Sequence, residues 1–321
     1  MTDTWEGRRV LVTGGAGFVG SRVAHELIAQ GAQVVILDDL FTGQRALIPP
    51  SADFVEGSVE DLDLVDQLVR NVDVVFHLAA RNIILSTSKP REDMAVNIGG
   101  TLNVLLAARE HGTDRVVYAS SASIYGNTHK HVWGDPQPYE ESDAPVLLSP
   151  YAVSKLAGEH YGKMFHTLYD VPVSIVRYSN VYGPGQSPDN PYCGVIGAFF
   201  TAAMTGGSIC VYGDGEQTRD YTFVDDTVRA TLMVGSSAGT VGECFNVGTG
   251  VGTSVNALAD LIQATVGKPV PIIHLPKRDI DTIPRRVVST YKLAHALGWS
   301  PNTLLRKGLT LTYQWMQESV K

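Results

Sequence analysis

Three glycines between a predicted strand and a predicted helix constrain the fold more than any other feature. Gly14, Gly17 and Gly20 follow a short apolar run at residues 8–13, and apolar side chains then recur at helical spacing over residues 23–28. The first glycine allows a tight turn, the second a close approach of a pyrophosphate, and the third close packing of helix on strand. The following helix begins with free N–H groups. This pattern predicts a dinucleotide site at the start of an α/β fold.

Strands and helices alternate along the next 160 residues. Continuously apolar runs predict strands at residues 33–37, 54–55, 72–78, 115–119 and 173–178, and helical spacing predicts helices at residues 62–70, 101–111 and 151–169. Strands that are apolar throughout are typical of a parallel sheet covered on both faces. We therefore expect a Rossmann-type doubly wound parallel sheet with a smaller mixed α/β domain after it.

The regular alternation of predicted strands and helices ends near residue 180. Residues 183–191 are rich in Gly and Pro, which marks a turn-rich loop. We expect residues 1–180 to form the nucleotide-binding domain, to which residues 220–245 return. The substrate domain is expected at residues 181–321, mainly 181–219 and 246–321. It would cap the carboxyl edge of the sheet, where doubly wound folds bind their ligands.

Composition excludes several classes of function. The chain has 321 residues, of which 44% are hydrophobic and 18% charged, as in ordinary globular enzymes. Its formal net charge of −8 argues against a nucleic-acid partner. The three cysteines show no metal-ligand spacing, so no metal site is predicted and reduced thiols are expected. No run approaches the roughly 20 apolar residues of a membrane span, so we expect a cytoplasmic protein without a membrane partner.

An acidic residue follows the second predicted strand. Asp38 comes 18 positions after Gly20, where a carboxylate can accept hydrogen bonds from an adenosine ribose and repel a 2′-phosphate. Asp39 is the alternative, and Asp38 is preferred because it comes first after the strand. The sequence therefore favours NAD over NADP as the cofactor.

Tyr151 and Lys155 lie four residues apart in a predicted helix, so their side chains project from the same face. A free phenol has a pKa of about 10, and a neighbouring ammonium, together with a cationic nicotinamide ring, should bring it toward neutrality. Such a group can remove a hydroxyl proton while hydride leaves the same carbon. Ser120, Ser121 and Ser123 follow a predicted strand 30 residues earlier and could contribute a hydroxyl.

These features together resemble the extended short-chain dehydrogenase/reductase family, and within it the sugar-nucleotide epimerases and dehydratases. The resemblance covers nearly the whole chain. It rests on several short motifs: Gly14-x-x-Gly17-x-x-Gly20, His77-Leu78-Ala79-Ala80, Asn97, Ser120-Ser121, Tyr151-x-x-x-Lys155, Arg177-Tyr178-Ser179-Asn180-Val181-Tyr182-Gly183-Pro184 and Gly213-Asp214-Gly215-x-x-x-Arg219-Asp220-Tyr221.

The resemblance implies a set of site residues. Ser121 would bind the reacting sugar oxygen beside Tyr151, and Lys155 would hold the nicotinamide ribose. The implied cofactor-binding residues are Gly14, Gly17, Phe18, Val19, Asp38, Ser58, Val59, Leu78, Ala79, Ala80, Asn97, Tyr151 and Lys155. The implied substrate-binding residues are Arg81, Ser121, Ser123, Tyr151, Asn180, Val195, Arg219 and Arg278. Relatives carry Asp after the glycine of the third strand, but Gly57-Ser58-Val59 stands here, so adenine contact there is in doubt or passes to backbone.

The same resemblance implies a UDP-sugar substrate. Arg219 matches a diphosphate-binding arginine, and Arg278 roughly matches a second one. Asn180 is expected to hydrogen-bond the pyrophosphate or the sugar, and Val195 could offer a backbone N–H at a helix start. A homodimer is expected through the two helices at residues 101–111 and 151–169.

The reaction that follows a 4-keto sugar decides the product. Ala122-Ser123 stands where 4,6-dehydratases have Asp-Glu, and that segment lacks the Glu of UDP-glucuronate decarboxylases. The remaining routes are 4-epimerisation and 5,6-dehydration of UDP-N-acetylglucosamine, as in nucleoside-antibiotic biosynthesis. Motif by motif the site is epimerase-like, but two features do not fit an epimerase well. The loop that begins at Arg81 is bulky and cationic, and Cys193 lies in a segment that borders the sugar in relatives, where its thiol could serve as acid or base or simply fill space. Over its whole length the chain resembles sugar-nucleotide 5,6-dehydratases, and this resemblance favours dehydration.

Two other classes of protein share the fold. A non-catalytic NAD-binding module would bind the cofactor without chemistry, since fold does not fix function. The presence of Ser121, Tyr151 and Lys155 together argues against that class. A net dehydrogenase would release reduced cofactor instead of returning the hydride.

Overall fold

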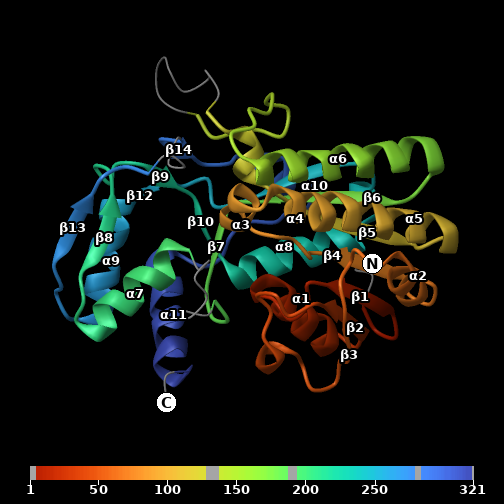
Figure 1. The fold of residues 1–321 in the computed structure, drawn as a ribbon, viewed down its shortest axis with the longest axis horizontal. Helices are drawn as coiled ribbons and strands as arrows, with labels where there is room; N and C mark the ends of the chain where they lie inside the picture. Colours follow the sequence, from red (N-terminus) through yellow and green to blue (C-terminus); the bar gives the residue numbers. More distant parts are fainter. Residues whose placement is uncertain (1–4, 128–136, 187–193, 279–282, 320–321) are drawn as a thin grey trace.

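A seven-stranded parallel sheet forms the centre of the larger lobe (Figure 1). The computed structural model describes residues 5–127, 137–186, 194–278 and 283–319. The strand order is β11-β6-β5-β4-β1-β2-β3, and every pairing is parallel. The strands are β1 (Arg9–Thr13), β2 (Gln33–Asp38), β3 (Asp53–Glu56), β4 (Val74–His77), β5 (Arg115–Ser121), β6 (Val173–Tyr178) and β11 (Cys244–Val247). The predicted doubly wound sheet is confirmed.

Strand side chains alternate between two buried faces, which explains why the strands are apolar throughout. Val10 and Val12 of β1 belong to one hydrophobic cluster, whereas Leu11 belongs to the other. In β4, Val74 contributes to the first cluster and Val75 to the second. Burying both faces in this way requires helices on each side of the sheet.

Two groups of helices cover these faces. Helices α1 (Phe18–Ala29) and α8 (Val224–Ser236) contribute to the first cluster, and α2 (Leu62–Val69), α5 (Thr101–His111) and α6 (Pro150–Tyr169) to the second. In Figure 1, α5 and α6 lie toward the upper right of the larger lobe, and α1 and α8 lie lower and closer to the smaller lobe. The segments between β4 and α5 are α3 (Ile83–Ser88), α4 (Pro90–Asp93) and the π-helix η2 (Met94–Gly100).

A smaller lobe lies at the left of Figure 1 and has a hydrophobic cluster of its own. Its helices are α7 (Val195–Thr205), α9 (Val255–Val266) and α11 (Leu305–Ser319). Its strands are β8 (Ile209–Tyr212), β9 (Thr218–Arg219), β12 (Thr253–Ser254), β13 (Ile272–Leu275) and β14 (Arg285–Arg286), which form two small sheets. The pair β7 (Asn180–Tyr182) and β10 (Tyr221–Phe223) connects the lobes.

The remaining short elements are the 3-10 turns η1 (Arg45–Leu47), η3 (Ala122–Tyr125) and η5 (Ala238–Thr240), and helix α10 (Tyr291–Leu297), which contacts β11. Among the described residues, no helix combines the length and apolar character needed to cross a membrane.

Candidate active site

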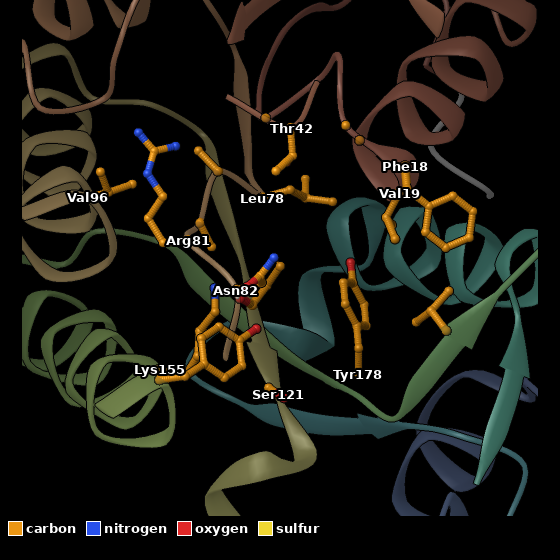
Figure 2. A pocket seen from close by; sticks show the side chains of 18 of the residues that line it. Phe18, Val19, Thr42, Leu78, Arg81, Asn82, Val96, Ser121, Lys155 and Tyr178 are labelled. Carbon is orange, nitrogen blue, oxygen red and sulfur yellow. Dashed lines mark hydrogen bonds between the residues drawn. The ribbon is translucent and has the colours of Figure 1, made fainter. Parts of the chain in front are cut away.

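A cavity of about 460 Å³ lies at the carboxyl ends of the central strands. Strands β1 and β4 are neighbours there although they are distant in sequence, and such a switch point is where doubly wound sheets bind ligands. Figure 2 shows Phe18, Val19 and Thr42 on one side of the cavity and Lys155 and Ser121 on the opposite side. The predicted residues that line it are Gly14, Gly17, Phe18, Val19, Asp38, Val59, Leu78, Ala79, Ala80, Arg81, Ser121, Tyr151, Lys155 and Asn180.

The glycine loop leaves no room for larger side chains. Gly14 has a φ of 72°, and a Cβ there would lie 2.7 Å from the backbone nitrogen of Ala79. A Cβ on Gly20 would overlap the carbonyl oxygen of Gly14. Gly17 is the N-cap of α1, and no side chain caps this helix end. The loop therefore presents uncapped amides and bare backbone to the cavity, as a pyrophosphate requires.

Asp38 is the last residue of β2 and contacts the glycine loop. Its carboxylate accepts hydrogen bonds from the backbone nitrogens of Ala16 (2.9 Å) and Leu40 (2.8 Å). Burial raises the pKa of Asp38, and these two backbone N–H groups oppose that shift. Asp39 also lines the cavity, but its carboxylate pairs with Arg81. Both carboxylates therefore border the cavity, and the ribose contact of Asp38 stays a prediction.

The Arg81 side chain does not point to the reactive end of the cavity. Its guanidinium pairs with Asp39 at 2.6 Å and lies 4.2 Å from the ring centroid of Phe41. Both partners follow β2, on the side where Asp38 meets a dinucleotide. A nearby carboxylate and ring thus already satisfy the charge of the guanidinium. Arg81 lines the cavity, and its contact with the substrate stays a prediction.

Ser121, Tyr151 and Lys155 meet at the other end of the cavity. The Ser121 hydroxyl hydrogen-bonds to the Tyr151 phenol and also accepts the backbone N–H of Ser123 at 3.1 Å. Lys155 donates to the carbonyl oxygen of Ala119 at 2.8 Å, and its ammonium lies 5.7 Å from the Tyr151 ring centroid. Helix α6 supplies two of these residues and begins at the Ser149 cap, whose hydroxyl accepts the N–H of Ala152.

In the protein alone, the Tyr151 phenol is less acidic than a free tyrosine. Burial raises the pKa of Tyr151 to about 12 in the protein alone, and the hydrogen bond from Ser121 only partly opposes it. Lys155 directs its ammonium to a carbonyl, and burial lowers the pKa of Lys155 to about 8 against the effect of Asp93 and Glu159. Burial therefore outweighs the hydrogen bond from Ser121 and the charge of Arg286, which both lower the pKa of Tyr151.

A buried ion pair supports the strand beneath the site. The Glu159 carboxylate accepts hydrogen bonds from Nε and Nη2 of Arg177, at 2.8 and 2.7 Å, and a third from the Ser120 hydroxyl. The Ser120 hydroxyl thus points into the protein interior and hydrogen-bonds to Glu159. The Ser121 hydroxyl instead hydrogen-bonds to the Tyr151 phenol in the cavity. Because Glu159 lies one turn beyond Lys155 on α6, the pair also fixes that helix against β5 and β6.

Two predicted cofactor residues do not line the cavity. The amide of Asn97 is buried and donates to Asp93, to the Ser154 hydroxyl and to the backbone oxygen of Arg81, whose N–H it accepts at 2.7 Å. It therefore positions the chain after β4 rather than facing a ligand. Ser58 bonds to Glu60 at the turn before α2, which corrects its expected cofactor contact.

The predicted substrate residues are spread along the junction with the smaller lobe. Asn180 lines the cavity, and Arg219 lies on β9 beside β14. The Arg278 guanidinium lies 4.3 Å from the ring centroid of Tyr212. Neither Arg219 nor Arg278 lines the cavity, and their contacts with the substrate stay predictions. Val195 begins α7 directly after Gly194, a lining residue.

The two remaining predicted site residues are Ser123 and Cys193. The Ser123 hydroxyl is buried and has no hydrogen-bond partner in the described structure, and Ser123 does not line the cavity. Cys193 lies outside the described residues.

Several lining residues escaped sequence reasoning. Thr42 lies shortly after the acidic pair, and Val96 lies in η2, between β4 and α5. Their signal was weak, because isolated polar or apolar residues in short turns carry no period. Tyr178 and Ser179 belong to a motif already noted, and only the fold shows that they face the cavity.

Comparison with known proteins identifies the family. The sequence profile of the NAD dependent epimerase/dehydratase family matches residues 10–248. A UDP-glucose 4-epimerase from Mycolicibacterium smegmatis is 39% identical over 319 residues, covering 96% of this chain and 98% of that protein. The crystal structure of UDP-glucose 4-epimerase with UDP-glucose from Thermotoga maritima superposes with a TM-score of 0.92 at 33% identity, covering 98% of this chain and 100% of that one.

A third relative bears on the cofactor. The Thermus thermophilus UDP-glucose 4-epimerase complex with NAD superposes with a TM-score of 0.88 at 34% identity, covering 96% of this chain and 99% of that one. The bare glycine loop and the Asp38 carboxylate fit NAD in this chain as well. From the family profile, the shared fold and this fit, we conclude that the chain belongs to the NAD-dependent epimerase/dehydratase family of enzymes.

Proposed function

We propose that this enzyme oxidises C4 of a UDP-hexose or UDP-hexosamine transiently and then reduces the product at the same site. One observation carries the proposal: Ser121, Tyr151 and Lys155 converge at the end of the cavity opposite the glycine loop. A dinucleotide whose pyrophosphate meets that loop would extend toward these three side chains. The UDP-glucose named for similar structures supports a UDP-sugar as substrate.

Each of the three residues has a distinct role in this proposal. Tyr151 takes the proton of the sugar 4-hydroxyl, and Ser121 holds the same oxygen through a hydrogen bond. Lys155 holds the ribose and adds positive charge near the phenol. NAD, when bound, accepts a hydride and supplies a cationic ring, the second charge needed to lower the pKa of Tyr151 from its buried value.

Dehydration across C5–C6 of UDP-N-acetylglucosamine is the product that the sequence favours. The C5 proton becomes acidic beside a C4 carbonyl, so a base can remove it as the 6-hydroxyl leaves with a proton. Ile83 lines the cavity, in keeping with a bulky loop beside the sugar. Cys193 remains the sequence candidate for an acid or base. The placement of Arg81 on Asp39 removes one argument for this route.

4-Epimerisation is the alternative, and the relatives favour it. It needs no acid or base beyond Tyr151 and Ser121, since the ketone only has to present its other face. Among the described lining residues, the carboxylates are Asp38 and Asp39, both at the end of β2. Neither is near Tyr151, so the described cavity holds no carboxylate base for C5.

Mass spectrometry of UDP-N-acetylglucosamine and UDP-glucose after incubation with the enzyme separates these products. Dehydration removes one water from UDP-N-acetylglucosamine, whereas epimerisation leaves the mass unchanged and alters the sugar proton couplings. Absorbance of reduced nicotinamide serves as the control, because the proposal expects none to accumulate. Stoichiometric accumulation would indicate a net dehydrogenase, and no product from either sugar would favour a binding module.

The homodimer expected from the sequence stays a prediction. Large apolar side chains are exposed on the two helices concerned, among them Leu106 on α5 and Val153 and Leu168 on α6. Burying them between two copies would remove apolar surface from water. Sedimentation velocity should give about twice the chain mass, and the paired substitution Val153→Lys and Leu168→Lys should give monomers. A wild-type monomer at micromolar concentration would contradict this expectation.

A further inference from the structure

Arg81 and Asp39 join two loops that lie on opposite sides of the glycine loop. In the sheet, β1 lies between β4 and β2, and Arg81 follows β4 whereas Asp39 follows β2. The Arg81 guanidinium donates to both carboxylate oxygens of Asp39, through Nη2 at 2.6 Å and Nη1 at 3.3 Å. Both residues line the cavity. The ion pair therefore connects the two sides of the cavity at the carboxyl end of β1, where the glycine loop begins.

The chain holds both partners of this pair in place. The backbone N–H of Arg81 donates to Asn97 Oδ1 at 2.7 Å, and the backbone oxygen of Arg81 accepts from Asn97 Nδ2 at 3.0 Å. On the other side, Leu40 has a φ of 55°, a left-handed conformation that leucine rarely adopts. This turn places Asp39 and Phe41 together at the guanidinium, which lies 4.2 Å from the Phe41 ring centroid. Uncommon backbone conformations of this kind cluster at functional sites.

The pair is shielded from water more than an ordinary surface ion pair. The side chains of Arg81 and Asp39 are 13% and 28% exposed, whereas those of Arg45 and Glu56, a pair that does not line the cavity, are 62% and 53% exposed. Exposed pairs contribute little because water and salt screen them, so the shielded pair should be the stronger one. The Arg81 Nε is also buried without a hydrogen-bond partner in the described part of the chain, which leaves one donor for a ligand.

The position of the pair along the cavity indicates which part of a dinucleotide it meets. Figure 2 shows the Arg81 side chain extending away from Ser121 and Lys155, the end that we assign to the reaction. Asp39 directly follows Asp38, the predicted contact of the adenosine ribose. A dinucleotide whose ribose meets Asp38 would therefore have its adenosine half beside the ion pair.

We propose that the Arg81–Asp39 pair is a latch that closes over the adenosine half of bound NAD and slows its release. The latch serves the proposed function and rests on it, because a hydride that returns to the sugar requires the cofactor to stay bound between the two steps. The pair stabilises the complex by holding the two loops together over the ligand. Because its charges compensate each other, it covers the pyrophosphate region without bringing an unpaired carboxylate to it.

Release of NAD labelled in the adenine ring, chased with excess unlabelled NAD, measures the latch directly. We expect Arg81→Gln and Asp39→Asn each to raise the dissociation rate about 10-fold, since loss of one partner of a shielded charge pair acts mainly on dissociation. The double substitution should release NAD no faster than the faster single variant, because both changes break the same interaction. A double variant that multiplies the two single effects would show that Arg81 and Asp39 contact NAD independently, and would contradict the latch.

Arg45→Gln is the matched control. It removes a guanidinium that pairs with Glu56 and lies over the Phe54 ring, the same kind of contact made by an exposed pair outside the cavity. Release of NAD should stay within about twofold of wild type. Circular dichroism of the variants without NAD shows whether they are folded, and the two single substitutions test the latch separately if one of them does not fold.

Calorimetric titration with NAD and ADP locates the effect, because ADP carries the adenosine half without the nicotinamide. Arg81→Gln should weaken both ligands by the same factor, about 10-fold. Wild-type affinity for ADP would overturn the placement over adenosine. Equal increases in the association and dissociation rates of NAD would mean that the pair only blocks the entrance, which would also overturn the latch. Slower release from Asp39→Asn would contradict it as well, since Arg81 would then bind NAD better without its partner.

Failure of the latch and failure of the proposed function give different results. Unchanged NAD release from both single variants would refute the latch alone, and weaker binding of a UDP-hexose by the same variants would then assign Arg81 to the substrate. An enzyme that forms no product from either UDP-sugar would refute the proposed function, even if its variants release NAD faster than wild type.

Discussion

Tyr151→Phe should lower kcat by about 10²- to 10⁴-fold, the usual contribution of a positioned acid–base group. The substitution removes one oxygen, the atom that hydrogen-bonds to Ser121 at the end of the cavity. Affinity for NAD should change by less than about threefold, because the glycine loop and Asp38 are untouched. Steady-state kinetics with a turned-over UDP-sugar and calorimetric titration of NAD measure the two quantities.

Tyr169→Phe is the matched control for that experiment. Tyr169 ends the same helix, is 42% exposed and lies beside Phe165 and Arg109, far along α6 from Tyr151. Its loss of a hydroxyl should leave kcat within about twofold of wild type. Near-normal turnover by Tyr151→Phe would show that another group removes the proton. Loss of turnover in both variants would point to damage to the helix.

Gly20→Ala is the second large effect that we expect. Its Cβ would overlap the carbonyl oxygen of Gly14, a backbone atom that can move only if the loop moves. Overpacking of this kind costs about 1–3 kcal/mol. If that cost falls on the loop that meets the pyrophosphate, NAD affinity decreases about 10- to 100-fold. Calorimetric titration of NAD and the melting temperature with and without NAD report the loss.

Gly99→Ala tests whether any added methyl group has this effect. A Cβ on Gly99 would lie 3.8 Å from the Met94 carbonyl oxygen, which is an ordinary van der Waals contact. Replacing glycine by alanine also reduces the conformational entropy of the unfolded chain. The free energy of unfolding should therefore be unchanged or slightly increased. NAD binding by Gly20→Ala equal to that of Gly99→Ala would mean that the loop relaxes freely.

The sheet could be predicted because its signal is periodic and local. Apolar runs placed β1, β2, β4, β5 and β6 within a few residues of their observed bounds. Helical spacing likewise located α6. Helix α8 was missed because its sequence mixes threonine and acidic residues among the apolar ones, and helix-forming residues are few. It is helical because its apolar face is buried against α1 and the sheet.

The site could be predicted less completely than the fold. Motifs named Ser121, Tyr151 and Lys155 correctly as neighbours in the cavity, although their chemical roles stay predictions. Motifs could not indicate that Arg81 turns back to Asp39, because that pairing depends on the angle at which the chain leaves β4.

The sequence by itself determined the family, the cofactor and the parallel sheet, because each depends on residues close together in the chain. These are the glycines of the loop after β1, the continuous apolar runs of the strands, and the four-residue spacing of Tyr151 and Lys155 on one helix. Only the tertiary structure decided which charges meet across long separations. It paired Arg81 with Asp39, bonded Asn97 into the interior, and set Arg286 beside Arg219. The physical reason is that the electrostatic energy of a charged side chain depends on its distance from other charges and on its burial, and packing sets both.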